Sequence, residues 1–185
     1  LWMMPFPNIE AYDFFFTKEP YAMRTLQTAG LRNIRYLPLY CVPAFHHPVD
    51  VPRELRVRFG HTASLVGRPY PYRERLVREL VDLPLRLWGP GWDRVKDQTV
   101  QALVAGGGVW GRTKLEIYSA TPVSLNPHHP MNDIVGVNIR AFELAASGAC
   151  QIVDDKEALL PLFKAGHEVV TFRDLAELRQ QLSYY

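Results

Sequence analysis

The chain has 185 residues, of which 48% are hydrophobic and 22% charged, and its formal net charge is +2. A chain of this size and composition folds into one domain, or one domain with an appendage, and is not disordered. The nearly neutral charge excludes a general attraction to nucleic acid or to a membrane surface. Any site for an anion must therefore be local.

The two cysteines, Cys41 and Cys150, are isolated in the sequence. Two such residues do not make a disulfide framework, so we expect reduced thiols. No apolar run approaches transmembrane length, and the first residues are too few for a secretory signal. We therefore expect a cytoplasmic protein. Because the chain begins with Leu1 rather than Met, we also expect it to be a piece of something longer.

The first 52 residues predict a short strand-helix-strand unit followed by a connection. The expected elements are a strand over residues 13–17, a helix over 20–28 that Gly30 closes, and a strand over 34–37. The proline-rich run 38–52, which contains His46-His47, marks a linker. We interpret residues 1–52 as the trailing part of a preceding α/β domain plus this linker, and residues 53–185 as a second domain.

Strands and helices alternate through the second domain. Expected strands are 62–66, 85–88, 123–126, 149–153 and 168–171. Expected helices are 72–81, 95–104, 113–118, one after Gly136 that buries Phe142, Leu144 and Ala145 and stops at Gly148, one from Lys156 that Pro161 ends or bends, and one from Asp174. The glycine run 106–108 reads as a flexible break. This alternation predicts a Rossmann-like, doubly wound parallel α/β sheet with its strand-end loops gathered on one edge.

The start of the helix after Gly136 carries Asn138, Arg140 and Glu143. A helix N-terminus presents free backbone N–H groups and a partial positive charge, which suit a phosphate. Arg140 adds a forked donor for phosphate oxygens, and Glu143 could accept hydrogen bonds from two ribose hydroxyls. The alternative is an ordinary amphipathic helix with both side chains solvated.

A second basic motif follows the strand over 62–66, where Gly67-Arg68 is followed five residues later by Arg73. Glycine lets a ligand approach the backbone, and two arginines at this spacing can bracket a diphosphate. The alternative is a turn with two solvated arginines.

Taken together, these motifs resemble the donor-binding signature of GT-B glycosyltransferases. The run Arg140-x-Phe142-Glu143, then Ala145-Ala146-Ser147-Gly148 and an apolar strand, is most similar to the group-1-like branch that includes the spore-maturation CgeB-type proteins. The resemblance is strongest from 62 to 172. It implies the C-terminal, nucleotide-sugar-binding half of a GT-B enzyme, which transfers a sugar from a nucleotide-diphosphate donor to an acceptor that the sequence leaves unidentified.

The resemblance also implies roles for individual residues. The donor diphosphate would contact Gly67, Arg68, Arg73, Asn138 and Arg140, the ribose Glu143, and the base and sugar Val109, Trp110, Asn126 and His128. Arg73 stands where related enzymes commonly carry lysine. Many retaining members have another Glu seven intervening residues before the ribose-binding one, and here that position is Val135, so the sugar contacts cannot be carried over. Trp110 could instead be an ordinary core or surface aromatic.

No metal or other cofactor is expected. The pairs His46-His47 and His128-His129 lack a third ligand at suitable spacing, and there is no Asp-x-Asp motif. Arginines and a helix terminus would then carry the phosphate charge. The sequence also lacks a Gly-x-Ser-x-Gly elbow, a Gly-x-Gly-x-x-Gly turn after the first strand, and a Walker motif, which argues against hydrolase, dehydrogenase and NTPase functions.

Two other functions stay open: a non-catalytic nucleotide-sugar-binding module and a GT-B-type epimerase fragment. The expected partners are a nucleotide-sugar donor, an acceptor, and either a missing N-terminal domain or further copies of the chain. The catalytic group, the base, the sugar and the stereochemical outcome are not specified by the sequence.

Overall fold

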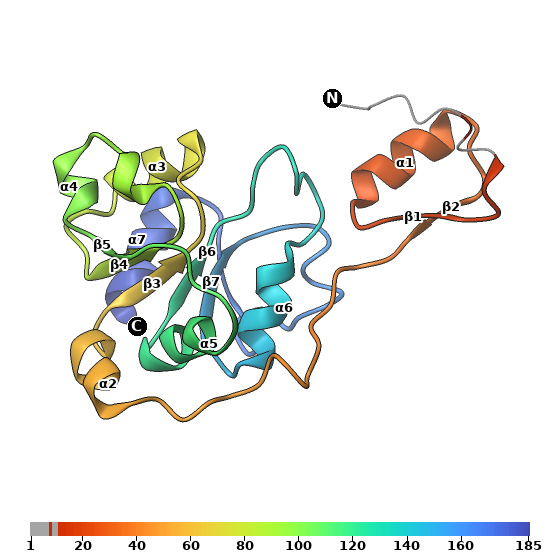
Figure 1. The fold of residues 1–185 in the computed structure, drawn as a ribbon. Helices are drawn as coiled ribbons and strands as arrows, with labels where there is room; N and C mark the ends of the chain where they lie inside the picture. The colour runs from red at the N-terminus through yellow and green to blue at the C-terminus, as the bar shows by residue number, and fades with distance from the viewer. Residues whose placement is uncertain (1–7, 9–10) are drawn as a thin grey trace.

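The computed structural model describes residue 8 and residues 11–185 (Figure 1). Within this part of the chain, six parallel strands form one sheet in the order β5-β4-β3-β6-β7-β8. The strands are β3 (Ala63–Val66), β4 (Leu85–Trp88), β5 (Val104–Gly106), β6 (Ser124–Asn126), β7 (Gln151–Asp154) and β8 (Val170–Phe172). The chain winds outward from β3 in one direction and then from β6 in the other, so β3 and β6 flank the switch point where such sheets bind ligands.

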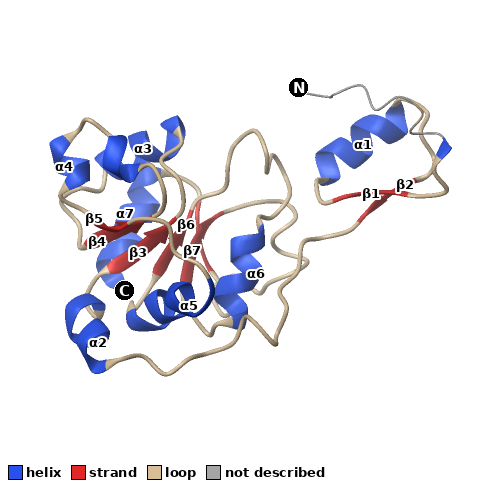
Figure 2. Cartoon of the chain, in the orientation of Figure 1, coloured by secondary structure: helices blue, strands red, loops and turns tan. Residues whose placement is uncertain are grey.

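Helices cover both faces of the sheet (Figure 2). They are α2 (Arg53–Phe59), α3 (Pro71–Arg78), α4 (Gln98–Gln101), α5 (Gly111–Ala120), α6 (Ile139–Ala146) and α7 (Leu175–Tyr184), with a 3₁₀ turn, η2 (Trp92–Arg94). Because strand side chains alternate in direction, β3 contributes to two cores. Leu65 packs in a cluster with Val77 of α3 and Leu178 of α7. Val66 packs in another with Phe59 of α2 and Ile117 of α5. The doubly wound α/β fold is therefore confirmed.

Several boundaries agree with the sequence because local signals fix them. Helix α1 (Pro20–Thr28) begins at its proline, and β4 has the expected bounds. Asn138 caps α6, its side-chain oxygen accepting the backbone N–H of Ala141 at 3.1 Å. Gly148 follows the helix with φ 69°, the left-handed conformation that glycine adopts without strain.

Other expectations were wrong. The helix expected over 95–104 is only α4, because the Asp97 carboxylate caps Thr99 and Val100 and Val104 pairs with Leu87 of β4. Gly106 therefore ends β5 and is not a flexible break. Helix α2 was not expected, and Phe59 of α2 packs edge-on against Trp88. Helix α5 begins at Gly111, earlier than the expected start at Thr113.

Two expectations for the last third were also wrong. No helix begins at Lys156: Leu159 donates to the carbonyl of Lys156 and Leu162 to that of Leu159, so the chain makes successive turns before and after Pro161. Ala145 is exposed rather than buried, because α6 faces the core through Ala141 and Leu144.

The N-terminal unit is a separate two-stranded parallel sheet of β1 (Phe15–Thr17) and β2 (Ile34–Tyr36) with α1 on it, as expected. Polar contacts join it to the segment between β6 and α6. The buried Glu19 carboxylate accepts backbone N–H groups of Val135 at 3.1 Å and Gly136 at 3.0 Å. Lys18 pairs with Asp133. Residues 37–52 then run past α6 to α2 (Figure 1).

Candidate functional site: a basic cavity at the switch point

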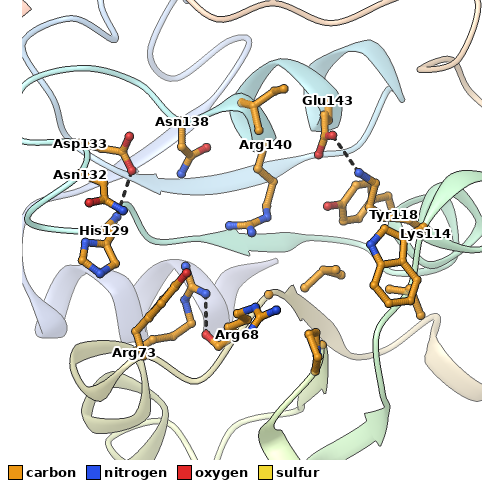
Figure 3. A pocket seen from close by; sticks show the side chains of 18 residues that line it. Arg68, Arg73, Lys114, Tyr118, His129, Asn132, Asp133, Asn138, Arg140 and Glu143 are labelled. Carbon is orange, nitrogen blue, oxygen red and sulfur yellow. Dashed lines mark hydrogen bonds and ion pairs between the residues drawn. The ribbon is translucent and has the colours of Figure 1, made fainter. Parts of the chain in front are cut away.

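A cavity of about 420 Å³ opens at the carboxyl ends of the central strands (Figure 3). Its walls are the loops after β3, β4, β5 and β6 together with residues of α3, α5 and α6. The lining residues are Val66, Gly67, Arg68, Tyr70, Arg73, Gly89, Pro90, Val109, Trp110, Lys114, Tyr118, His129, Asn132, Asp133, Asn138, Ile139, Arg140 and Glu143. The strand-end loops that the sequence grouped together thus enclose one site.

The floor of the cavity depends on two glycines. Gly67 has φ 152° and Gly89 φ 144°, conformations that side chains rarely adopt. A Cβ on Gly89 would lie only 2.3 Å from the carbonyl oxygen of Gly67. That same oxygen accepts the indole N–H of Trp92 at 2.6 Å. The ends of β3 and β4 therefore touch backbone to backbone, which leaves room above them.

Arg73 lies in the first turn of α3 and is 4% exposed. Its Nη1 donates to the carbonyl of Arg68 at 2.7 Å, and its Nη2 to the hydroxyl of Tyr72 at 2.9 Å. Burial and the neighbouring positive charge of Arg140 lower the pKa of Arg73, and Tyr72 partly offsets them. No carboxylate neutralises this guanidinium. A bound anion would therefore stabilise its charged form.

Arg140 reaches the cavity from the N-terminus of α6, on the far side from Arg73 (Figure 3). Its Nη1 donates to Oδ1 of Asn126 at 3.2 Å. Asn126 is fully buried and also contacts Asn138 and Gln151. Asn126 is thus not among the lining residues but lies behind them, where it holds Arg140 and the helix cap.

Glu143 forms an ion pair with Lys114 of α5, whose Nζ lies 2.8 Å from Oε1. Tyr118 follows Lys114 by one helical turn and lines the same wall. Burial raises the pKa of Tyr118 to about 12, although the charge of Arg140 opposes this. Neither Lys114 nor Tyr118 was predicted from the sequence. The available signal was their four-residue spacing, which places both on one face of a helix that follows a strand-end loop.

Trp110 is 72% exposed at the cavity mouth, so it is not a core residue. Its ring lies over Gly108, where a Cβ would come within 2.2 Å of it. Val109 lines the cavity beside it. Because Gly108 has no side chain, the Trp110 ring can pack over it and form one wall of the cavity mouth.

The two adjacent histidines point in different directions. His128 is buried and is not among the lining residues; its Nδ1 lies 2.7 Å from Oδ1 of Asp154. His129 lines the cavity and packs edge-on against the rings of Tyr70 and Tyr72. In the part of the chain that the structure describes, no three His, Cys, Asp or Glu side chains gather where they could hold a metal ion.

The structure thus gathers most of the sequence-derived candidates around one space. Those that line it are Gly67, Arg68, Arg73, Val109, Trp110, Asn138, Arg140 and Glu143. Asn126 and His128 lie behind the wall instead. Within the described residues, no helix combines the length and hydropathy needed to cross a lipid bilayer.

A doubly wound parallel sheet with a cavity at its switch point is found in nucleotide-binding proteins, among them the C-terminal half of GT-B glycosyltransferases. The sequence profile of the glycosyl transferase-like family matches residues 68–185. The chain belongs to this family. It is also 23% identical over 195 residues to spore protein CgeB of Bacillus subtilis, a match that covers 96% of this chain and 58% of that protein.

Solved structures show the same fold. HepE from Anabaena, in complex with UDP-glucose, superposes with a TM-score of 0.66 at 13% identity, over 93% of this chain and 53% of that one. Sucrose-phosphate synthase from Thermosynechococcus elongatus superposes with a TM-score of 0.60 at 16% identity, over 91% and 48%. The chain therefore spans about half the length of these proteins.

Proposed function

We propose that this chain is the donor-binding part of a metal-independent glycosyltransferase that transfers a sugar from a nucleoside-diphosphate sugar. Arg68, Arg73 and Arg140 would bind the diphosphate, together with the N–H groups at the start of α6. Glu143 would hold the ribose, and the wall at Val109 and Trp110 the base. The same arginines would stabilise the negative charge that develops on the leaving diphosphate.

The observation that carries this proposal is the charge of the cavity wall. Its two carboxylates are each paired with a lysine, Asp133 with Lys18 and Glu143 with Lys114. Its arginines, by contrast, form no ion pair with a carboxylate of the described residues. Three guanidinium groups without counter-charges, in a cavity of this volume, match a small polyanion better than a neutral ligand.

The geometry of Glu143 supports a ribose contact. Lys114 engages Oε1, and no described residue hydrogen-bonds Oε2. The carboxylate side chain is 12% exposed, toward the cavity. An acceptor oxygen fixed in this way can receive a hydroxyl hydrogen bond, and the lysine prevents it from swinging away. The HepE complex, which holds UDP-glucose in the same fold, is consistent with a nucleotide sugar as ligand.

One observation favours a second candidate, a nucleotide-sugar-binding module without transfer activity. Val135 stands where retaining members carry their sugar-binding Glu, and it packs with the apolar cluster around Val137 and Val153. It is not among the residues lining the cavity. Measuring release of free sugar from a nucleotide sugar separates the two candidates, because a module that only binds would leave its ligand intact.

Calorimetry with UDP, GDP, ADP and CDP tests the site. We expect one of them to bind, and Arg68→Ala and Glu143→Ala each to weaken it about tenfold or more, the size expected for a hydrogen bond to a charged group. Arg75→Ala is the matched control, since Arg75 is exposed on α3 and does not line the cavity. If both site variants bind like the unmodified chain, the assignment fails.

A further inference from the structure

A histidine of the linker lies next to Glu143, the residue on the ribose side of the cavity. His46 lies in the segment 37–52, between the N-terminal unit and the large sheet. Its Nε2 is 3.5 Å from Oε1 of Glu143, the oxygen that also pairs with Lys114. The side chains of His46 and Glu143 are 19% and 12% exposed. A residue far from the donor motif in sequence thus touches the carboxylate proposed to hold the ribose.

The linker holds this imidazole in a defined orientation. The carbonyl of Val42 accepts the N–H groups of Phe45 and His46, each at 2.8 Å, which closes a tight turn. The N–H of Val42 in turn lies 3.1 Å from Nδ1 of His46 and donates to it. An accepting Nδ1 places the ring hydrogen on Nε2. The turn therefore selects the tautomer with its N–H on Nε2, the nitrogen that lies 3.5 Å from Oε1 of Glu143.

We infer that His46 is a positioning residue for Glu143 and makes the interdomain linker part of the donor site. This inference rests on the proposed function. Lys114 approaches Oε1 from α5 and His46 approaches it from the linker, so the carboxylate is fixed from two sides and Oε2 is left for the ribose.

The neighbouring residue shows that this contact is specific. His47 is exposed, and its Nδ1 lies beside the carbonyl of the next residue, Pro48, rather than beside Glu143. Two histidines of the same linker thus differ in whether they lie next to Glu143. His47 therefore supplies a control that changes the same chemical group in the same segment.

The experiment uses the whole chain and calorimetry with the tightest binder among UDP, GDP, ADP and CDP, and with its 2′-deoxy form. The variants are His46→Leu, His46→Gln and His47→Leu. Glutamine can place its amide N–H near the position of Nε2, whereas leucine has no donor. A general loss of structure would weaken both nucleotides equally, but a role in positioning Glu143 acts on the ribose hydroxyls.

We expect His46→Leu to weaken the ribonucleotide about threefold, the size expected for a weak polar contact, and the 2′-deoxy form much less. His46→Gln should restore most of the loss, and His47→Leu should bind like the unmodified chain. If His46→Leu leaves the ribonucleotide affinity unchanged, or weakens both nucleotides alike, the positioning role is wrong while the proposed function stands. If the unmodified chain binds none of the four nucleotides, both the positioning role of His46 and the proposed function are wrong.

Discussion

The guanidinium groups of Arg73 and Arg140 both lie next to Gly67, although the two residues belong to the first turns of different helices, α3 and α6. A Cβ on Gly67 would lie 2.7 Å from Nη1 of Arg73 and 2.9 Å from Nη2 of Arg140. Two like charges are held this close only because other contacts fix each of them. Their mutual repulsion is relieved when an anion lies between them.

Gly67→Ala should weaken nucleoside-diphosphate binding about tenfold while leaving the affinity for the nucleoside almost unchanged. The added methyl group would displace both guanidinium groups, and φ 152° disfavours any side chain. Gly107→Ala is the control, because a Cβ there meets nothing within 4 Å. Calorimetry with the two ligands checks this prediction; equal losses for both would contradict it.

Arg73→Lys should weaken diphosphate binding about tenfold although the charge is kept. Lysine cannot reach both the carbonyl of Arg68 and the hydroxyl of Tyr72, so the loop after β3 loses its support. Arg75→Lys, an exposed change on the same helix, should have no effect. Calorimetry measures the affinity of both variants for the same nucleoside diphosphate. Unchanged binding by Arg73→Lys would show that the positive charge at this position suffices and that the two hydrogen bonds do not contribute.

Lys114→Met should destabilise the free protein by about 1–2 kcal/mol, because it leaves the mostly buried Glu143 carboxylate without its lysine. Arg112→Met removes an exposed pair with Glu116 on the same helix and should change stability by less than about 0.5 kcal/mol. Urea unfolding measures both. Similar losses in the two variants would mean that the Lys114 contact is no stronger than a surface ion pair.

Asp154→Asn should reduce stability near neutral pH and lose this effect in acid. Burial alone would raise the pKa of Asp154, but hydrogen bonds from His128 and the charge of Lys156 lower it below 3.8. A depressed folded-state pKa stabilises the protein above the unfolded value, and this stabilisation is lost as the pH falls through the folded value.

The difference in urea midpoint between Asp154→Asn and the unmodified chain should therefore be largest at pH 7 and shrink below about pH 3.8. Asp155→Asn, a change at the exposed neighbouring position, is the control. A difference that stays constant over this range would contradict the prediction.

Glu19→Gln should loosen the N-terminal unit from the large sheet. The carboxylate accepts N–H groups of Tyr21, Val135 and Gly136, and a neutral amide with one oxygen replaces these charge-assisted bonds poorly. We expect faster proteolysis within the linker 37–52. Glu54→Gln, an exposed change on α2, should leave the cleavage rate unaltered, and equal rates for all three proteins would show that other contacts anchor the unit.

Much of the fold, and the arginines that line the cavity, could be predicted because local sequence signals are strong at these positions. Pro20, Asn138 and Gly148 mark helix ends through backbone geometry alone, and apolar runs mark the buried strands. The order of strands and helices then requires that Gly67, Arg73 and Arg140 fall on one edge. Segments without such signals were misjudged, as at 95–104, where a cap at Asp97 and pairing with β4 outweigh helical spacing.

The sequence by itself determined the α/β class, the edge that carries the loops and the arginines found there, since these follow from periodicity and from the handedness of parallel crossovers. Only the tertiary structure decided which neighbours support them. Lys114 and His46 come to Glu143 from another helix and from the linker, and His128 turns to Asp154 while His129 faces the cavity. Contacts between segments distant in the chain depend on packing, which leaves no periodic trace in the sequence.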